Sequence, residues 1–187
     1  ELTRAPQAAG ENTVAAGTSM RKGELLVEAG STLTPPLVAL AAQGGYAELP
    51  VLAKPRVAFI PSGNELRPVG SRLPRGKSIE CNSLMFPGMV RAWGAEALVD
   101  DICPDDWDTI RARIERNLEN ADILVVNAGS SKGTDDLTME ILEQMGTCIC
   151  HEFNHGPGRH SSLFFVDSKP VVGIAGPPIG AEFGIEW

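Results

Sequence analysis

A chain of 187 residues can hold one core-forming domain of ordinary size with an appendage, but hardly two full domains. Its formal net charge of -8 argues against a nucleic-acid partner, because nucleic acids are bound through clustered Lys and Arg side chains. No segment approaches the roughly 20 apolar residues of a membrane helix, and the first residues lack the pattern of a secretory signal, so we expect a cytoplasmic protein.

The first 54 residues predict a linker followed by a small appended segment. Residues 1–16 are small and polar without a period, which is typical of a linker. Residues 17–54 contain one short helix, which Thr34 and the two prolines after it begin and which a Gly-Gly pair ends. The main domain is therefore expected in residues 55–187.

Strand and helix signals alternate through residues 55–187. Strands are predicted at residues 57–60, 95–101, 123–126, 163–166 and 171–174 and around Cys148, where Cys148 and Cys150 would share one face. Helices are predicted at residues 83–93 and 137–145, and after Asp105 or Asp106, where Ile110, Ile114 and Leu118 fall on one face. This alternation predicts a three-layer α/β/α domain whose helices cover a mostly parallel sheet.

Parallel sheets bind ligands outside the carboxyl ends of their strands, which selects the loops at residues 61–82, 103–106, 128–136 and 175–180. The strongest signal is Asn-Ala-Gly-Ser-Ser-Lys-Gly-Thr-Asp-Asp at residues 127–136, after a buried strand and before a helix. Its glycines favour a tight turn whose amides and hydroxyls could hold an anion at the positive helix end. An ordinary glycine-rich turn, with Asp136 as the helix cap, is the structural alternative.

Acidic side chains follow two other predicted strands. Glu65 is placed to coordinate Mg²⁺ or to orient water, or else is a solvated loop residue. One of Asp105 and Asp106 should cap the next helix, which would leave the other free to face a ligand. Pro177, in the turn after the last strand, belongs either to a rigid pocket wall or to a simple turn.

These four loops, in this order, resemble those of the molybdenum-insertase family, whose molybdopterin-binding fold also occurs in molybdopterin adenylyltransferases and competence-damage-type proteins. The family segments T-G-D-E-L, D-S-N, G-G-V-S-V-G-x-x-D and G-L-P-G-N-P look like residues 62–66, 80–82, 128–136 and 173–178. Residues 21–30 with Thr34 and Pro35 also resemble the segment that precedes this domain in the insertases.

The resemblance implies a Mg²⁺-dependent reaction in which molybdopterin or its adenylylated form is bound, molybdate is placed on the dithiolene and the nucleotide bond is hydrolysed. Carried over by position, Glu65, Asp105 and Asp136 would be the catalytic carboxylates, with Glu65 and Asp136 on the metal. The residues that would hold the pterin nucleotide are Gly129, Ser130, Ser131, Gly133, Arg159 and Pro177.

The sequence departs from the family pattern at several positions. An acidic residue of the family's leading segment is Ser19 here, the lysine that precedes the family's P-G-K-P loop is Gly156, and the asparagine of the final turn is Pro178. These departures keep two alternatives open: a non-catalytic molybdopterin-binding module, and a nucleotide pyrophosphatase of the competence-damage type. Because family members are often dimers, a homodimer also stays open.

Overall fold

The computed structural model describes residues 8–127, 137–154 and 156–186. The chain divides into two compact units, Glu1–Leu52 and Ala53–Trp187. The first unit contains helix α1 (Pro35–Gln43), which begins after the extended N-cap Thr34 and ends at Gly44, with Gly45 in the left-handed region at a φ of 91°. The short helix predicted from the prolines and the Gly-Gly pair is confirmed.

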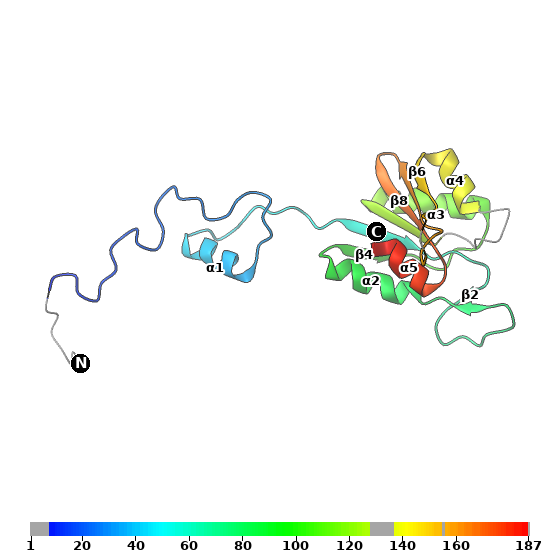
Figure 1. The fold of residues 1–187 in the computed structure, drawn as a ribbon, viewed down its shortest axis with the longest axis horizontal. Helices are drawn as coiled ribbons and strands as arrows, with labels where there is room; N and C mark the ends of the chain where they lie inside the picture. Colours follow the sequence, from blue (N-terminus) through cyan, green and yellow to red (C-terminus); the bar gives the residue numbers. More distant parts are fainter. Residues whose placement is uncertain (1–7, 128–136, 155, 187) are drawn as a thin grey trace. The chain divides into compact units, whose positions relative to one another are not determined.

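The second unit is built on a six-stranded sheet (Figure 1). Its strands are β1 (Arg56–Ile60), β4 (Glu96–Val99), β5 (Ile123–Asn127), β6 (Thr147–His151), β7 (Ser162–Val166) and β8 (Lys169–Ile174). They lie in the order β4-β1-β5-β8-β7-β6. The first four are parallel to their neighbours, while β7 is antiparallel to both β8 and β6. The predicted mostly parallel sheet is confirmed.

Helices cover both faces of this sheet (Figure 1). They are α2 (Asn82–Ala92), α3 (Trp107–Asn120), α4 (Leu137–Met145) and α5 (Pro178–Glu186). One core packs α3 and α4 against the sheet, and a second core packs α2 and α5 against the opposite face. The predicted three-layer architecture is therefore correct. Across the described residues no helix has both the length and the apolar character to cross a membrane.

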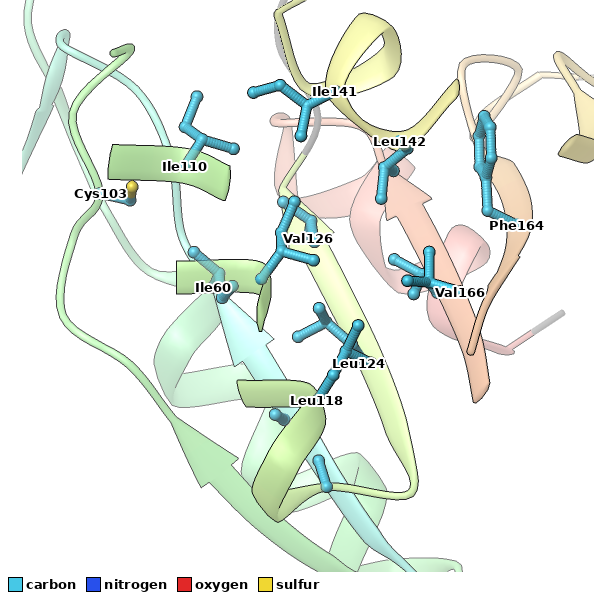
Figure 2. Close-up of a cluster of buried hydrophobic side chains, with 14 of the residues drawn as sticks. Ile60, Cys103, Ile110, Leu118, Leu124, Val126, Ile141, Leu142, Phe164 and Val166 are labelled. Atoms are coloured by element: carbon cyan, nitrogen blue, oxygen red, sulfur yellow. The ribbon is translucent and has the colours of Figure 1, made fainter. Parts of the chain in front are cut away.

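The larger core fixes the strands that lead to the site (Figure 2). Ile60 of β1 and Leu124 of β5 are fully buried, as are Ile110 of α3 and Ile141 of α4. Each such side chain contributes roughly 1.5–3 kcal/mol when it leaves water. Successive residues of a strand face opposite sides, so Phe59, next to Ile60, belongs to the second core. With both faces packed, the carboxyl ends of β1 and β5 are held in fixed positions.

Three local features differ from the sequence-based expectations. The strand predicted at residues 95–101 ends at Val99, because Asp100 turns to accept hydrogen bonds from α3. Two short strands, β2 (Leu66–Arg67) and β3 (Ser78–Ile79), pair in parallel in the loop after β1 and are too short to show a period.

The expectation that Cys148 and Cys150 share one face of their strand is wrong. The register of β6 shifts between these two residues, so that Cys148 lies opposite Phe164 and Cys150 lies opposite Leu163. Phe164 and Leu163 are neighbours on β7 and point to opposite faces. The bulge therefore breaks the alternation on which the expectation depended.

Candidate functional site

The carboxyl ends of the parallel strands meet at one edge of the sheet. Ile60 of β1 is in register with Val126, and Asn127, the last residue of β5, is in register with Ile174 of β8. The loop after β4 joins this edge through a parallel bridge between Ser62 and Cys103. The carboxyl ends of four strands therefore converge where an open α/β sheet binds its ligands.

Buried polar side chains tie these loops together in what we call the edge network: Ser62, Asn82, Asn127 and the backbone of Gly176. The Ser62 hydroxyl donates to the Asn127 carbonyl at 2.5 Å. The Asn82 Nδ2 donates to Asn127 Oδ1 at 3.2 Å and to the Gly176 carbonyl at 3.0 Å. The network links the loops after β1 and β8 with the last residue of β5 and the start of α2.

One side-chain oxygen of the edge network is buried without a hydrogen-bond partner in the described part of the chain. Asn82 is 4% exposed, and its Oδ1 has no hydrogen-bond partner among the described residues. A buried acceptor without a partner costs about 1–3 kcal/mol, so such groups are few in folded proteins. The Asn82 Oδ1 is therefore available to accept a hydrogen bond from a group outside the described residues.

The loops that carry two predicted carboxylates, Glu65 and Asp105, are joined through Asn64. The Asn64 amide donates to Asp105 Oδ2 at 2.8 Å, and the Asp105 amide donates to Asn64 Oδ1 at 3.3 Å. These two bonds join the loop of Glu65 to the loop of Asp105. Glu65 is exposed, and its carboxylate folds over Gly63, where an added Cβ would lie 2.6 Å from Glu65 Oε2. Glycine at position 63 permits this approach.

Asp106 has the capping role that sequence reasoning left between two residues. Its carboxylate accepts from the Thr109 amide at 2.9 Å and from the Thr109 hydroxyl at 2.5 Å, at the first turn of α3. These hydrogen bonds lower the pKa of Asp106 below its ordinary value. Asp105 is therefore free of the cap and faces Asn64.

Arg159 lies in a loop that touches α5. Gly158 packs there so closely that an added Cβ would lie 3.2 Å from the Phe183 Cβ. The Arg159 guanidinium pairs with Glu152 at 3.4 Å, and His160 contacts the same carboxylate at 3.1 Å. Desolvation opposes the shift, but His160 and Arg159 together hold the pKa of Glu152 below its ordinary value. The cation predicted for ligand binding thus already has a carboxylate partner.

The remaining predicted site residues divide into two groups. Pro177 is exposed, and its carbonyl accepts the Ala181 amide at the first turn of α5. The predicted phosphate and metal residues Gly129, Ser130, Ser131, Gly133 and Asp136 lie outside the described residues. Within the described part of the chain, no three His, Cys, Asp or Glu side chains are grouped so that they could hold a metal ion.

Sequence reasoning missed the edge network as a set of site residues. Its signal was present, because Asn127 ends an otherwise apolar strand and Ser62 follows another one. Asn82 stood inside a segment that resembles the family, but its side chain was given no role. A polar residue at the carboxyl end of a buried strand, or within two positions after it, lies at the ligand edge, and this rule would have found Asn127 and Ser62.

These features define a class: three-layer α/β domains with carboxylates and buried amides at the carboxyl edge of a mostly parallel sheet. Within that class, the family described as probable molybdopterin binding domain matches residues 58–187. The chain belongs to this family. A molybdopterin-related small molecule is therefore the class of ligand that family membership supports.

Curated relatives and solved structures agree with this assignment. The chain is 29% identical over 184 residues to a molybdopterin molybdenumtransferase of Staphylococcus aureus, covering 98% of this chain and 44% of the relative. It is also 29% identical to molybdopterin molybdenumtransferase 2 of Mycobacterium tuberculosis, over 95% of this chain and 45% of that protein. The chain thus spans less than half the length of the curated relatives it matches.

Solved structures of related proteins have the same fold. A molybdopterin biosynthesis MoeA protein of Pyrococcus horikoshii superposes with a TM-score of 0.74 at 29% identity, covering 87% of this chain and 40% of that one. A MoaB protein of Thermus thermophilus, at 16% identity and a TM-score of 0.55, shares the fold. The resemblance to the insertase family and the molybdopterin-binding fold predicted from sequence are both confirmed.

Proposed function

We propose that the chain binds molybdopterin or its adenylylated form at the carboxyl edge of the sheet and takes part in molybdenum insertion during molybdenum-cofactor biosynthesis. The observation that carries this proposal is the pair of hydrogen bonds through Asn64 that joins the loops of Glu65 and Asp105. Both loops lie within residues 58–187, which match the family. The names of the curated relatives support the reaction class.

The described residues suit Mg²⁺ at this place. Glu65 and Asp105 supply hard carboxylate oxygens from adjoining loops, and Mg²⁺ prefers one or two carboxylates with phosphate oxygens of its substrate. The neighbouring thiol of Cys103 does not compete, because burial raises its pKa and keeps it neutral. Glu65, together with Asp136 from outside the described residues, is the proposed metal ligand set, and Asp105 would supply a further carboxylate beside it. Bound there, Mg²⁺ would neutralise phosphate charge and polarise the bond to be hydrolysed.

The chain's own groups then have distinct tasks. Glu65 and Asp105 hold the reacting end of the ligand, and the edge network fixes the loops that carry them. Gly129, Ser130, Ser131 and Gly133 are proposed to bind phosphate, with Pro177 as a wall at the start of α5. Arg159 would bind a phosphate of the ligand only if that phosphate replaced Glu152 as the partner of its guanidinium.

Molybdate is the second proposed substrate, because insertion requires it on the dithiolene. The cytoplasm is the proposed compartment, and a homodimer, which the family resemblance implies, is the proposed assembly. Sedimentation analysis of the chain at micromolar concentration measures the assembly directly.

A role in binding without turnover is the second candidate function. The pairing of Arg159 with Glu152 favours it, because the loop then offers little free positive charge. Gly156 in place of a family lysine removes a further charge.

Release of AMP separates these candidates. The chain is incubated with adenylylated molybdopterin, molybdate and Mg²⁺, and AMP is measured by chromatography. For an insertion enzyme, Glu65→Gln and Asp105→Asn each reduce the rate by about 100-fold or more. The control Asp108→Asn, an exposed carboxylate of α3, changes it less than about twofold.

The other outcomes are equally informative. Saturable binding without AMP release identifies the binding module. Hydrolysis of ADP-ribose, without any requirement for the pterin, would identify a nucleotide pyrophosphatase. Absence of pterin binding by the folded chain overturns the proposal.

A further inference from the structure

The segment from β2 to β3 is positively charged in a chain that is acidic as a whole. Residues 66–79, which we call the basic excursion, carry Arg67, Arg72, Arg75 and Lys77 and none of the 24 acidic side chains of a protein with a net charge of -8. The excursion begins directly after Glu65. A concentrated positive field therefore lies beside the candidate site.

Backbone pairing fixes both ends of the basic excursion next to Glu65. Leu66 pairs with Ser78 and Arg67 pairs with Ile79 in the ladder of β2 and β3. The Ser78 amide donates to the Glu65 carbonyl at 3.0 Å. The cations nearest these ends consequently have defined positions relative to the site.

Two of the four cations converge on a single atom. The Lys77 ammonium and the Arg67 Nη1 each donate to the Asn64 carbonyl at 3.1 Å, and Arg67 Nη1 also donates to the Leu66 carbonyl at 2.6 Å. Lys77 has two further donors, and Arg67 keeps its Nε and Nη2 groups. Both side chains belong to residues that are partly buried.

No carboxylate neutralises this pair in the described part of the chain. The ion pairs found there involve Arg111, Arg113, Arg116, Arg159 and His160. Two like charges held at one carbonyl repel each other, so an anion placed between them is favoured. Arginine adds a planar fork that matches phosphate oxygens.

We propose that Arg67 and Lys77 form an anion subsite for the diphosphate of the nucleotide-linked ligand. The inference rests on the proposed function and deepens it by naming the group recognised and its place. Asn64 lies between a negative and a positive group. Its amide donates to the Asp105 carboxylate, and its carbonyl accepts from Arg67 and Lys77. A magnesium diphosphate is complementary to this arrangement, with the metal toward the carboxylates and the oxygens toward the cations.

The subsite also supplies the charge that the loop at residues 156–160 lacks. Arg159 is paired with Glu152, whereas the side chains of Arg67 and Lys77 have only carbonyl partners among the described residues. Arg72 and Arg75 are exposed, and attract anions at longer range.

The test compares two double variants with the same loss of charge. Arg67→Gln with Lys77→Gln removes the converging pair, and Arg72→Gln with Arg75→Gln is the matched control within the same excursion. Each is titrated with adenylylated molybdopterin and, separately, with inorganic pyrophosphate, both with Mg²⁺. The first variant should bind both probes about tenfold more weakly or worse, and the control less than about threefold.

A measurement on the unaltered chain guards against a variant that fails to fold. Saturating pyrophosphate should protect Lys77 from acetylation while Lys22 and Lys54 react at unchanged rates, as read by mass spectrometry. A Lys77 that reacts equally with and without pyrophosphate contradicts the subsite.

The outcomes separate this inference from the proposed function. If the pterin nucleotide binds equally well to both double variants, the subsite is wrong and the proposed function stands. Equal weakening by both variants also overturns the subsite, because it shows diffuse attraction. If pyrophosphate binding depends on Arg67 and Lys77 but the pterin nucleotide does not bind at all, the diphosphate subsite stands and the proposed function fails.

Discussion

The edge network and the two carboxylates Glu65 and Asp105 differ in burial, although Ser62 and Glu65 are only three residues apart. Ser62, Asn82 and Asn127 are at most 5% exposed and bond chiefly to one another and to backbone. Glu65 and Asp105 are exposed and held through backbone and Asn64. Buried neutral amides can be lost only at a cost to stability, whereas exposed charges can be altered freely and are available to a ligand. Burial thus separates the groups that shape the site from those that act in it.

Replacing Asn127 should have the largest effect on stability. Asn127→Ala removes the acceptor of Asn82 Nδ2 and the donor to the Ser62 carbonyl inside the protein. We expect a loss of about 2 kcal/mol in the free energy of unfolding, measured with urea. Asn120→Ala, which removes one exposed helix contact, is the control and should stay within about 0.5 kcal/mol. If the two variants were equally stable, the buried hydrogen bonds of Asn127 would contribute no more to stability than the exposed one of Asn120.

Asp100 combines the two properties, because its side chain is charged like Glu65 but buried like Asn127. Its side chain is 8% exposed and accepts from Arg113, Arg116 and Asn117. Burial raises its pKa, but the Asn117 hydrogen bond and the arginines outweigh burial and leave that pKa below its ordinary value. Asp100→Asn should therefore lower the free energy of unfolding by about 1.5 kcal/mol at pH 7.

The pH dependence of that difference follows from the sign of the shift. A carboxyl with a lowered pKa in the folded state stabilises the protein above its unfolded pKa of about 4. The stabilisation is lost as pH falls through the lower, folded value. Urea unfolding of the unaltered chain and Asp100→Asn should thus differ less at pH 3 than at pH 7. A constant difference would contradict the role assigned to the charge.

A smaller effect is expected where the Arg159 loop meets α5. An added Cβ at Gly184 would lie 2.6 Å from Ser161 Oγ and 3.0 Å from Ile174 Cγ2. Gly184→Ala should cost about 1 kcal/mol by crowding. Gly88→Ala, within α2 and with open space around it, should stabilise by about 0.5 kcal/mol. Thermal unfolding measures both, and a shift of the same sign for the two variants would refute the tight contact.

The smallest effect on stability is expected at the exposed carboxylate. Glu65→Gln should change the free energy of unfolding by less than about 0.5 kcal/mol, because the side chain is solvated and an amide keeps its shape. A urea titration beside Asn127→Ala provides the comparison. A loss as large as that of Asn127→Ala would show that Glu65 holds the fold.

The layers of the fold could be predicted because each element carries its own signal. Ile110, Ile114 and Leu118 repeat at helical spacing on α3, and short apolar runs mark the buried strands. The end of β4 could not be predicted, because it depends on partners of Asp100 in a helix that comes later in the chain.

The site could be predicted in outline only. Glu65 and Asp105 were candidates because they follow strands, and the sharing of roles between Asp105 and Asp106 needed the Thr109 contact. The Asn82 bonds to Asn127 and Gly176 join residues that are 45 and 94 positions apart. No spacing rule predicts contacts between residues so far apart in the chain, so the hydrogen bonds of the edge network could be found only in the structure.

Calorimetric titration of adenylylated molybdopterin into the unaltered chain and Glu65→Gln, with and without Mg²⁺, tests the central claim most directly. The claim is that exposed carboxylates at the carboxyl edge bind the metal-bearing end of a pterin nucleotide. We expect saturable, Mg²⁺-dependent binding that Glu65→Gln weakens by about tenfold or more while the unfolding free energy is kept. Binding that needs no Mg²⁺ and is unchanged in Glu65→Gln, or no binding to the folded chain, would contradict it.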